Sequence, residues 1–194
     1  MKIIGITGGV GSGKSRVLSY LAEEYGAFVC QADHVAWELQ MPGASCYEQI
    51  LSVFGGGILQ DDGTINRKKL GQIVFADKER LQELNAIMHP AVKEKISLII
   101  NEQKQTDTNL FVLEAALLLE EHYDAICDEV WYIYTSEPVR RERLKSSRQY
   151  TDERINAIIS TQKDEMFFRE VCDKIIDNSS AFEETCRQIK EIMK

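Results

Sequence analysis

A glycine-rich segment near the start of the chain has the spacing of a loop that binds phosphate groups. It spans residues 8–15, GGVGSGKS, and matches G-x-x-x-x-G-K-[ST] at every position. Glycines let successive backbone N–H groups converge on phosphate oxygens, and a helix that begins near Lys14 adds the positive end of its dipole. Lys14 would reach the β- and γ-phosphates, and the Ser15 hydroxyl would be a ligand of Mg²⁺. The segment therefore predicts a site for the triphosphate of ATP with its magnesium ion.

The fate of a bound triphosphate depends on the rest of the chain, because motors, switches and small-molecule kinases all use this loop. The alternative is a glycine-rich turn that caps a helix and binds nothing, but the position between an apolar segment and a helical segment favours binding. The sequence contains no Asn-Lys-x-Asp motif for reading guanine. Motor and transporter ATPases are usually larger, so we favour a kinase.

Phosphoryl transfer to an alcohol needs a carboxylate that orients the acceptor hydroxyl and takes its proton. Asp33 follows a predicted strand at residues 27–30. Open parallel sheets bind their ligands at the carboxyl ends of the strands. We therefore predict that Asp33 lies next to the phosphate loop and is the general base. The alternative is that Asp33 caps a helix that begins near His34.

A run of basic residues lies between positions 140 and 148 of an otherwise acidic chain. Its cations are Arg140, Arg141, Arg143, Lys145 and Arg148. Helical spacing places Arg141, Lys145 and Arg148 on one face and Arg140 and Arg143 on another. We interpret the run as a mobile lid over the triphosphate, with Arg143 as the catalytic candidate and Arg148 as a nucleotide contact. The spacing does not decide which arginine meets which oxygen, and the alternative is a solvated face paired with Glu137 and Glu142.

Four further polar residues have both a structural and a functional interpretation. His89 precedes Pro90, which is typical of the first position of a helix, so we predict helix initiation there rather than acid–base catalysis. Arg67 has the place of an exposed residue in the first turn of a helix. Glu114 could hold a magnesium-bound water or pair with a cation elsewhere, and both stay open. Asn178 follows the last predicted strand, where a loop could contact the nucleotide base, although turn chemistry also explains its type.

The segments that must position these residues alternate between strand and helix. Short apolar runs predict strands at residues 2–7, 27–30, 110–115, 130–134 and 174–177. Helical spacing follows the glycine-rich loop until Gly26, dominates residues 34–101 with interruptions, and returns after residue 177. Five strands that alternate with helices predict an α/β fold, with a parallel sheet covered on both faces.

The composition limits the classes of partner. The chain has 194 residues and a formal charge of −8, from 23 Lys and Arg against 31 Asp and Glu. An acidic chain is a poor general binder of nucleic acid. No apolar run approaches the roughly 18 residues of a membrane span, and Gly5 interrupts the start where a signal peptide would continue. The five scattered cysteines predict neither disulfides nor a zinc site. We therefore expect a cytoplasmic protein without nucleic-acid or membrane partners.

With these motifs, the chain resembles the dephospho-CoA kinase family over nearly its whole length. The family's opening T-G-G-x-G-S-G-K-S is matched by residues 7–15, and its A-D by residues 32–33. Its D-G-x-x-x-R-x-x-L block is matched by residues 62–70, its L-N-x-I-x-H-P by residues 84–90, and its I-D-N by residues 176–178. Many unrelated proteins share the loop alone, but its combination with these blocks is specific.

The resemblance implies a P-loop NTPase fold, which is a three-layer sandwich with a five-stranded parallel sheet, a helical acceptor-binding insertion and a basic lid. It implies one kinase domain: a core of about residues 1–54, 100–136 and 163–194, an acceptor subdomain of about residues 55–99 and a lid of about residues 137–162. The implied ATP contacts are Gly9, Gly11, Ser12, Gly13, Lys14, Ser15, Arg16, Arg148 and Asn178. The implied acceptor contacts are Asp33, Arg67 and His89. Arg16 replaces the family's usual threonine, and the Ser15 hydroxyl keeps its role.

The resemblance further implies an activity. The γ-phosphoryl group of ATP would be transferred to the ribose 3′-hydroxyl of dephospho-CoA, giving CoA and ADP in the last step of coenzyme A biosynthesis. A kinase for a nucleoside or a nucleoside monophosphate is the nearest alternative, because it would share the core and differ in the acceptor subdomain. A regulatory module that binds ATP without forming ADP is an alternative from another class. We expect a monomer or a weak homo-oligomer.

Overall fold

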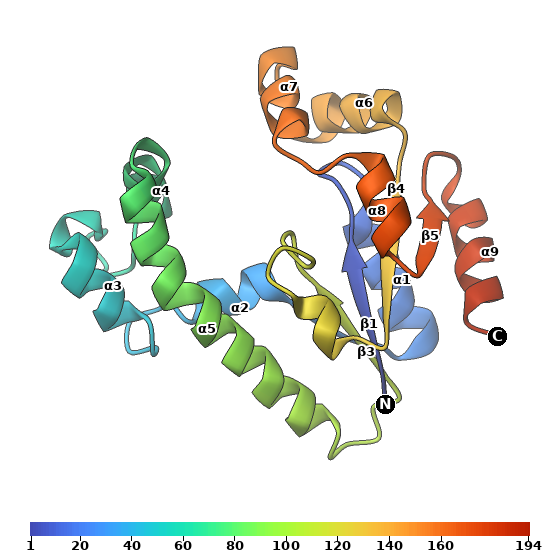
Figure 1. The fold of residues 1–194 in the computed structure, drawn as a ribbon, viewed down its shortest axis with the longest axis horizontal. Helices are drawn as coiled ribbons and strands as arrows, with labels where there is room; N and C mark the ends of the chain where they lie inside the picture. The colour runs from blue at the N-terminus through green and yellow to red at the C-terminus, as the bar shows by residue number, and fades with distance from the viewer. The chain divides into compact units, whose positions relative to one another are not determined.

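The computed structural model describes all 194 residues and has strands and helices in the expected alternation (Figure 1). The strands are β1 (Lys2–Thr7), β2 (Phe28–Gln31), β3 (Leu110–Glu114), β4 (Glu129–Tyr134) and β5 (Lys174–Asp177). The helices are α1 (Lys14–Tyr25), α2 (Ala32–Glu38), α3 (Tyr47–Phe54), α4 (Arg67–Ala76), α5 (Lys78–Gln103), α6 (Glu137–Arg148), α7 (Asp152–Ser160), α8 (Glu165–Val171) and α9 (Phe182–Ile192). All five strands predicted from the sequence are confirmed, because apolar runs between turn residues mark buried strands strongly.

The five strands form one parallel sheet in the order β2-β3-β1-β4-β5. The central strand β1 pairs through Ile4 with Val112 of β3 and through Gly5 with Val130 of β4. Parallel strands bring their carboxyl ends to one edge, so the segments after β1 and β3 begin at the same edge. The order places β3 between β1 and β2. The strand that precedes Asp33 is therefore not the immediate neighbour of the strand that precedes the phosphate loop.

The chain divides into two compact units, which are residues 1–29 with 107–194, and residues 30–106. The first unit contains β1, β3, β4 and β5 with helices α1 and α6 to α9, and the second contains helices α2 to α5. The phosphate loop and the basic run belong to the first unit. Asp33, Arg67 and His89 belong to the second.

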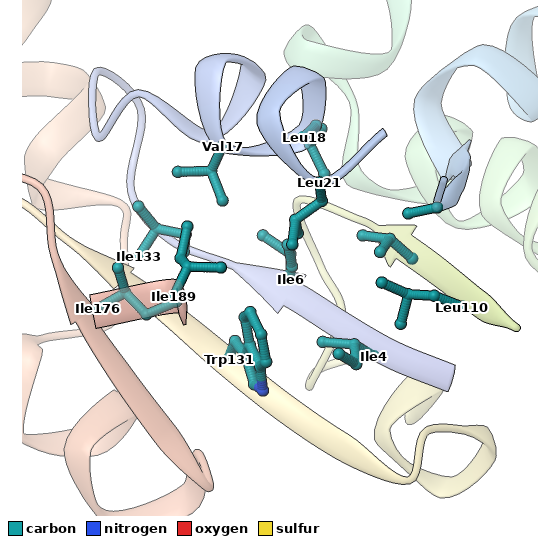
Figure 2. Packing of buried hydrophobic residues seen from close by; sticks show 12 residues of the cluster. Ile4, Ile6, Val17, Leu18, Leu21, Leu110, Trp131, Ile133, Ile176 and Ile189 are labelled. Carbon is teal, nitrogen blue, oxygen red and sulfur yellow. The ribbon is translucent and has the colours of Figure 1, made fainter. Parts of the chain in front are cut away.

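The core of the first unit lies between α1 and one face of the sheet (Figure 2). Val17 and Leu21 of α1 point toward Ile6 of β1, and all three side chains are fully buried. On the opposite face, the ring of Tyr132 stacks on Phe168 of α8 with the centroids 4.6 Å apart. Both faces of the sheet are therefore covered, as the strand and helix pattern predicts.

The second unit is organised around the long helix α5, which differs from the sequence-based expectation. The predicted helix start at Pro90 is wrong, because Pro90 lies inside α5. An internal proline removes one backbone hydrogen bond and crowds the preceding turn. Buried apolar side chains on both sides of it, among them Met88 and Val92, hold the helix continuous across this position. The helix instead begins after Asp77, whose carboxylate accepts from the backbone N–H groups of Glu79 and Arg80.

Two further expectations concern the state of the cysteines and the presence of membrane-spanning helices. All five cysteines are free thiols. None of the helices combines the length and the apolar character that crossing a membrane would take.

We predict that Leu21→Ala destabilises the protein by about 2–5 kcal/mol, because it removes a fully buried side chain between α1 and the sheet. Leu98→Ala is the matched control, since Leu98 is 50% exposed and the same deletion there should cost less than about 0.5 kcal/mol. Urea unfolding followed by circular dichroism measures both. Equal losses in the two variants would contradict this account of the core.

Candidate active site

The phosphate loop connects the carboxyl end of β1 to the first turn of α1. Gly11 and Gly13 have φ angles of +84° and +85°, a backbone conformation that L side chains rarely adopt. Gly13 is also the N-cap of α1, and no side chain caps this helix end. This end of the helix is therefore not capped by its N-cap residue, which makes it suited to an anion.

The amine of Lys14 folds back over the start of the loop. Its Nζ atom donates to the carbonyl of Gly8 at 2.8 Å and lies 3.6 Å from Oε1 of Glu114. Both ionic side chains are largely buried, with 16% and 11% exposed for Lys14 and Glu114. Of the two interpretations of Glu114 that the sequence left open, the structure shows the pairing with a cation. Lys14 is the residue that would contact the β- and γ-phosphates. Its amine lies at the Gly8 end of the loop, so we expect these phosphates at that end.

Hydrogen bonds to the carbonyl oxygen of Ser12 hold the loop in place. Nδ2 of Asn178 donates to it at 2.7 Å, and Oγ1 of Thr135 lies 2.9 Å from it. The Asn178 side chain is itself fixed, because its Oδ1 accepts from the Thr185 hydroxyl at 2.9 Å. The Ser12 hydroxyl is buried without a hydrogen-bond partner. Two segments far from the loop in sequence therefore hold its backbone in place.

Sequence analysis predicted Arg143 as a catalytic residue and Asn178 as a nucleotide contact. In the structure these two residues are hydrogen-bonded to each other next to the loop. Nη2 of Arg143 donates to the Asn178 carbonyl at 2.8 Å, and Nη1 lies 3.4 Å from the Ser12 carbonyl. These contacts are structural. The roles of the two residues toward ATP stay predictions.

Arg140 also contacts the loop. It was not among the site residues predicted from the sequence. Its Nε donates to the Val10 carbonyl at 3.0 Å, and its Nη2 donates to the side chain of Gln162. A Cβ atom added at Gly9 would lie 2.5 Å from Nη2 of Arg140. The sequence contained two signals for Arg140: its place in the basic run interpreted as a lid, and the helical spacing that groups it with Arg143 on one face.

The other face of α6 pairs with exposed acids. Arg141 Nε lies 2.7 Å from Glu137, and Lys145 Nζ lies 2.7 Å from Asp152. The interpretation of the run as a charged surface is thus correct for Arg141. Arg148 is exposed in the last turn of α6, where its hydrogen bond lowers the pKa of Tyr150.

Two residues in the first turn of α1, Ser15 and Arg16, are exposed. Ser15, the predicted magnesium ligand, is exposed in the first turn. The guanidinium of Arg16 lies over the ring of Phe182 at 4.0 Å from its centroid, a cation–π contact. The residue that departs from the family pattern is therefore held against the start of α9.

A cavity of about 350 Å³ in the first unit adjoins the loop at Gly9. Its lining has both signs of charge and two stacked aromatic rings. The cations are Arg140 and Lys163, the acids are Glu137, Asp164 and Glu165, and the rings are Tyr132 and Phe168. Because burial lowers the pKa of Arg140, its charged form is less favourable here than in water. An anion near Gly9 would offset this cost.

The second unit has its own cavity, of about 450 Å³. Arg67 and Lys68 line it together with Trp37. The turn before Arg67 is built by Asp62, whose carboxylate accepts from the N–H of Thr64 at 2.9 Å and from its hydroxyl. These bonds lower the pKa of Asp62. The Asp-Gly motif thus shapes the chain so that Arg67 opens α4 at the cavity.

Asp33 lies in the first turn of α2, exposed and one helical turn before Trp37. Residues four apart share a helix face, so Asp33 and Trp37 lie on the same side of α2. The alternative that Asp33 is an N-cap is wrong, since the N-cap of α2 is Gln31. His89 is partly buried within α5. Trp37 was not predicted, because a single tryptophan gives no motif.

These features define a P-loop kinase, in which a strand, a phosphate loop and a helix stand in a parallel five-stranded sheet. Shikimate kinase from Acinetobacter baumannii has this fold, with a TM-score of 0.54 and 14% identity over 100% of this chain and 93% of that one. At this identity, the likeness concerns the fold alone. Dephospho-CoA kinase from Campylobacter jejuni is more similar, with a TM-score of 0.72 and 28% identity over 99% of this chain and 98% of that one.

Sequence comparison identifies the family within the class of P-loop kinases. Residues 2–184 match the family model described as dephospho-CoA kinase. The dephospho-CoA kinase of Carboxydothermus hydrogenoformans is 36% identical over 100% of this chain and 93% of the relative. That of Geobacter sulfurreducens is 39% identical over 99% of this chain and 97% of the relative. The chain belongs to the dephospho-CoA kinase family, which confirms the resemblance seen in its motifs.

We predict that Asn178→Ala lowers the free energy of unfolding by about 1–3 kcal/mol, because the buried Ser12 carbonyl loses a donor and Thr185 loses an acceptor. A looser loop should also weaken ATP binding. Asn101→Ala, at an exposed position of α5, is the control. Thermal unfolding and calorimetric titration with ATP measure the two effects, and an unchanged stability would contradict the anchoring role.

Proposed function

We propose that this kinase transfers the γ-phosphoryl group of ATP to the ribose 3′-hydroxyl of dephospho-CoA, giving CoA and ADP. The observation that carries the proposal is the complete phosphate loop between β1 and α1 in a chain of the dephospho-CoA kinase family. Lys14 offsets the charge that develops on the transferred group. The acceptor hydroxyl attacks phosphorus in line with the leaving ADP, and its proton passes to a carboxylate.

We propose Mg²⁺ as the ion that accompanies ATP. The donors fit it, because the Ser15 hydroxyl is exposed directly after Lys14, and magnesium prefers a few protein oxygens together with phosphate oxygens and water. When bound, the ion neutralises charge on the triphosphate and orients it. Ser15 would hold it through its Oγ atom. The Lys14 amine would neutralise further charge on the β- and γ-phosphates.

The acceptor is proposed to bind in the cavity of the second unit. Arg67 and Lys68 supply positive charge for the phosphates of dephospho-CoA, and Trp37 supplies an aromatic surface for a planar or apolar part. Asp33 lies one turn before Trp37 on the same face of α2, and Trp37 lines the cavity. This supports Asp33 as the general base that orients the 3′-hydroxyl. His89 is proposed as a further acceptor contact.

The remaining parts of the proposal concern the lid and the surroundings of the enzyme. Residues of about 137–162, with Arg143 and Arg148, are proposed to close over ATP and exclude water that would otherwise hydrolyse it. The net charge of −8 supports the absence of a nucleic-acid partner. We propose that the enzyme works in the cytoplasm as a monomer or a weak homo-oligomer.

The acceptor assay tests the proposal directly. ADP release is followed with dephospho-CoA, with its 3′-deoxy analogue, and with a panel of nucleosides and nucleoside monophosphates. We expect turnover with dephospho-CoA and none with the 3′-deoxy analogue, because that analogue lacks the attacking oxygen. Turnover with nucleosides or nucleoside monophosphates alone would establish the alternative kinase. ATP binding without ADP formation from any acceptor would establish a regulatory module.

We predict that Asp33→Asn lowers kcat by about 10²- to 10⁴-fold, because the amide cannot accept the proton of the hydroxyl. The dissociation constant for ATP should stay within about twofold, since Asn keeps the size of the side chain. Asp107→Asn, at an exposed position in the segment before β3, is the control and should have wild-type turnover. Steady-state kinetics and equilibrium binding measure both variants. Wild-type kcat in Asp33→Asn would refute the role of a general base.

A further inference from the structure

The Arg140 guanidinium is a partly buried cation whose hydrogen-bond acceptors are both neutral. These acceptors are the Val10 carbonyl and the side-chain oxygen of Gln162. Glu137, on the same helix, forms its ion pair with Arg141 and acts on Arg140 only through its charge. Burial of the guanidinium is unfavourable for its charged form and lowers the pKa of Arg140, although the charge of Glu137 acts in the opposite direction. The arrangement therefore favours an anion at this position.

The position of Arg140 along the loop indicates which anion. The Lys14 amine, which serves the β- and γ-phosphates in loops of this type, hydrogen-bonds to the carbonyl of Gly8. Gly8 therefore marks the end of the loop where the terminal phosphate would lie. Arg140 packs on Gly9, the next residue, so it stands at the same end. Arg143, in contrast, contacts Ser12 in the middle of the loop and Asn178 outside it.

We propose that Arg140 recognises the terminal phosphate of the nucleotide and thereby determines the preference of the loop for a triphosphate over a diphosphate. Gln162, in the segment between α7 and α8, orients the guanidinium. The proposal rests on the proposed function only in taking ATP as the ligand of the loop. It does not depend on the identity of the acceptor.

The same contact couples residue 9 to Arg140. The φ angle of Gly9 is not in the region that excludes side chains, so the backbone alone would accept alanine. The obstacle is the Arg140 guanidinium, whose Nη2 and Nη1 atoms would lie 2.5 Å and 2.8 Å from the new Cβ. Alanine at this position must therefore displace Arg140, which makes Gly9 and Arg140 a coupled pair.

The first experiment measures the binding of a non-hydrolysable ATP analogue and of ADP, each with Mg²⁺, by titration calorimetry. In Arg140→Gln we expect affinity for the analogue to fall about ten- to hundredfold, as for loss of a hydrogen bond between charged groups. Affinity for ADP should change by less than about threefold. Arg140→Lys, which keeps the charge and loses the planar fork, should lose less than Arg140→Gln. Arg187→Gln, at an exposed site on α9, is the control and should leave both affinities unchanged.

A double-mutant cycle then tests the coupling. Gly9→Ala alone should reduce affinity for the ATP analogue about as much as Arg140→Gln does, because it displaces the guanidinium. The double variant should be no worse than Arg140→Gln alone, since the two changes remove the same interaction. Additive losses would mean that Gly9 and Arg140 act independently, and would overturn the coupling.

Equal losses of affinity for ADP and for the ATP analogue in Arg140→Gln would show that the residue only supports the loop, and would overturn the proposal. So would unchanged affinity for both. These outcomes are separate from failure of the proposed function, because binding is measured without an acceptor. Turnover with nucleosides alone would refute dephospho-CoA as the substrate and leave the role of Arg140 standing.

Discussion

The site depends on one physical constraint, which is that the backbone of the phosphate loop must stay open with its N–H groups convergent. A free glycine-rich segment would lose this arrangement, since glycine has the largest backbone entropy of any residue. The structure meets the constraint by fixing the Ser12 carbonyl through Asn178 and Thr135, which follow β5 and β4. The loop is therefore shaped before a nucleotide arrives, and the sheet is the support that shapes it.

Charge is distributed to suit this loop despite an acidic chain. The formal charge of −8 opposes general binding of polyanions, yet three cations contact the loop directly. Lys14 lies across its start, Arg140 on Gly9, and Arg143 against Ser12. The remaining charges of α6 pair with exposed acids, as Arg141 does with Glu137. One short basic helix thus has a face toward the loop and a face toward solvent.

Much of the fold follows from the sequence because its signals are local. The five strands are short apolar runs, and the loop has the spacing that is typical of phosphate-binding loops between a strand and a helix. Pro90 shows the limit of local rules, because burial of its neighbours in α5 outweighs the preference of proline for a helix start. The separation of β1 from β2 by β3 was likewise invisible, since strand order depends on contacts between distant segments.

The candidate site was predicted in part, for a similar reason. Lys14 was predicted to contact the phosphates, and Glu114 was left open between a magnesium-bound water and a cation elsewhere. Their pairing depends on the register of β1 and β3, which the sequence does not give. Arg140 was one of five cations in the basic run. Helical spacing divided these cations between two faces of α6, but it could not predict which face contacts the loop. Trp37 belongs to no motif, and only the folded second unit brings it to the cavity beside Arg67.

The most direct measurement is a crystal structure with Mg²⁺ and a non-hydrolysable ATP analogue. The account predicts that the phosphates follow residues 8–15, with the terminal phosphorus at the Gly8 end, next to the Lys14 amine and the Arg140 guanidinium. The Ser12 carbonyl should keep its hydrogen bond to Asn178. A triphosphate bound elsewhere, or one that lies in the loop with its terminal phosphate at the Ser15 end, would contradict it.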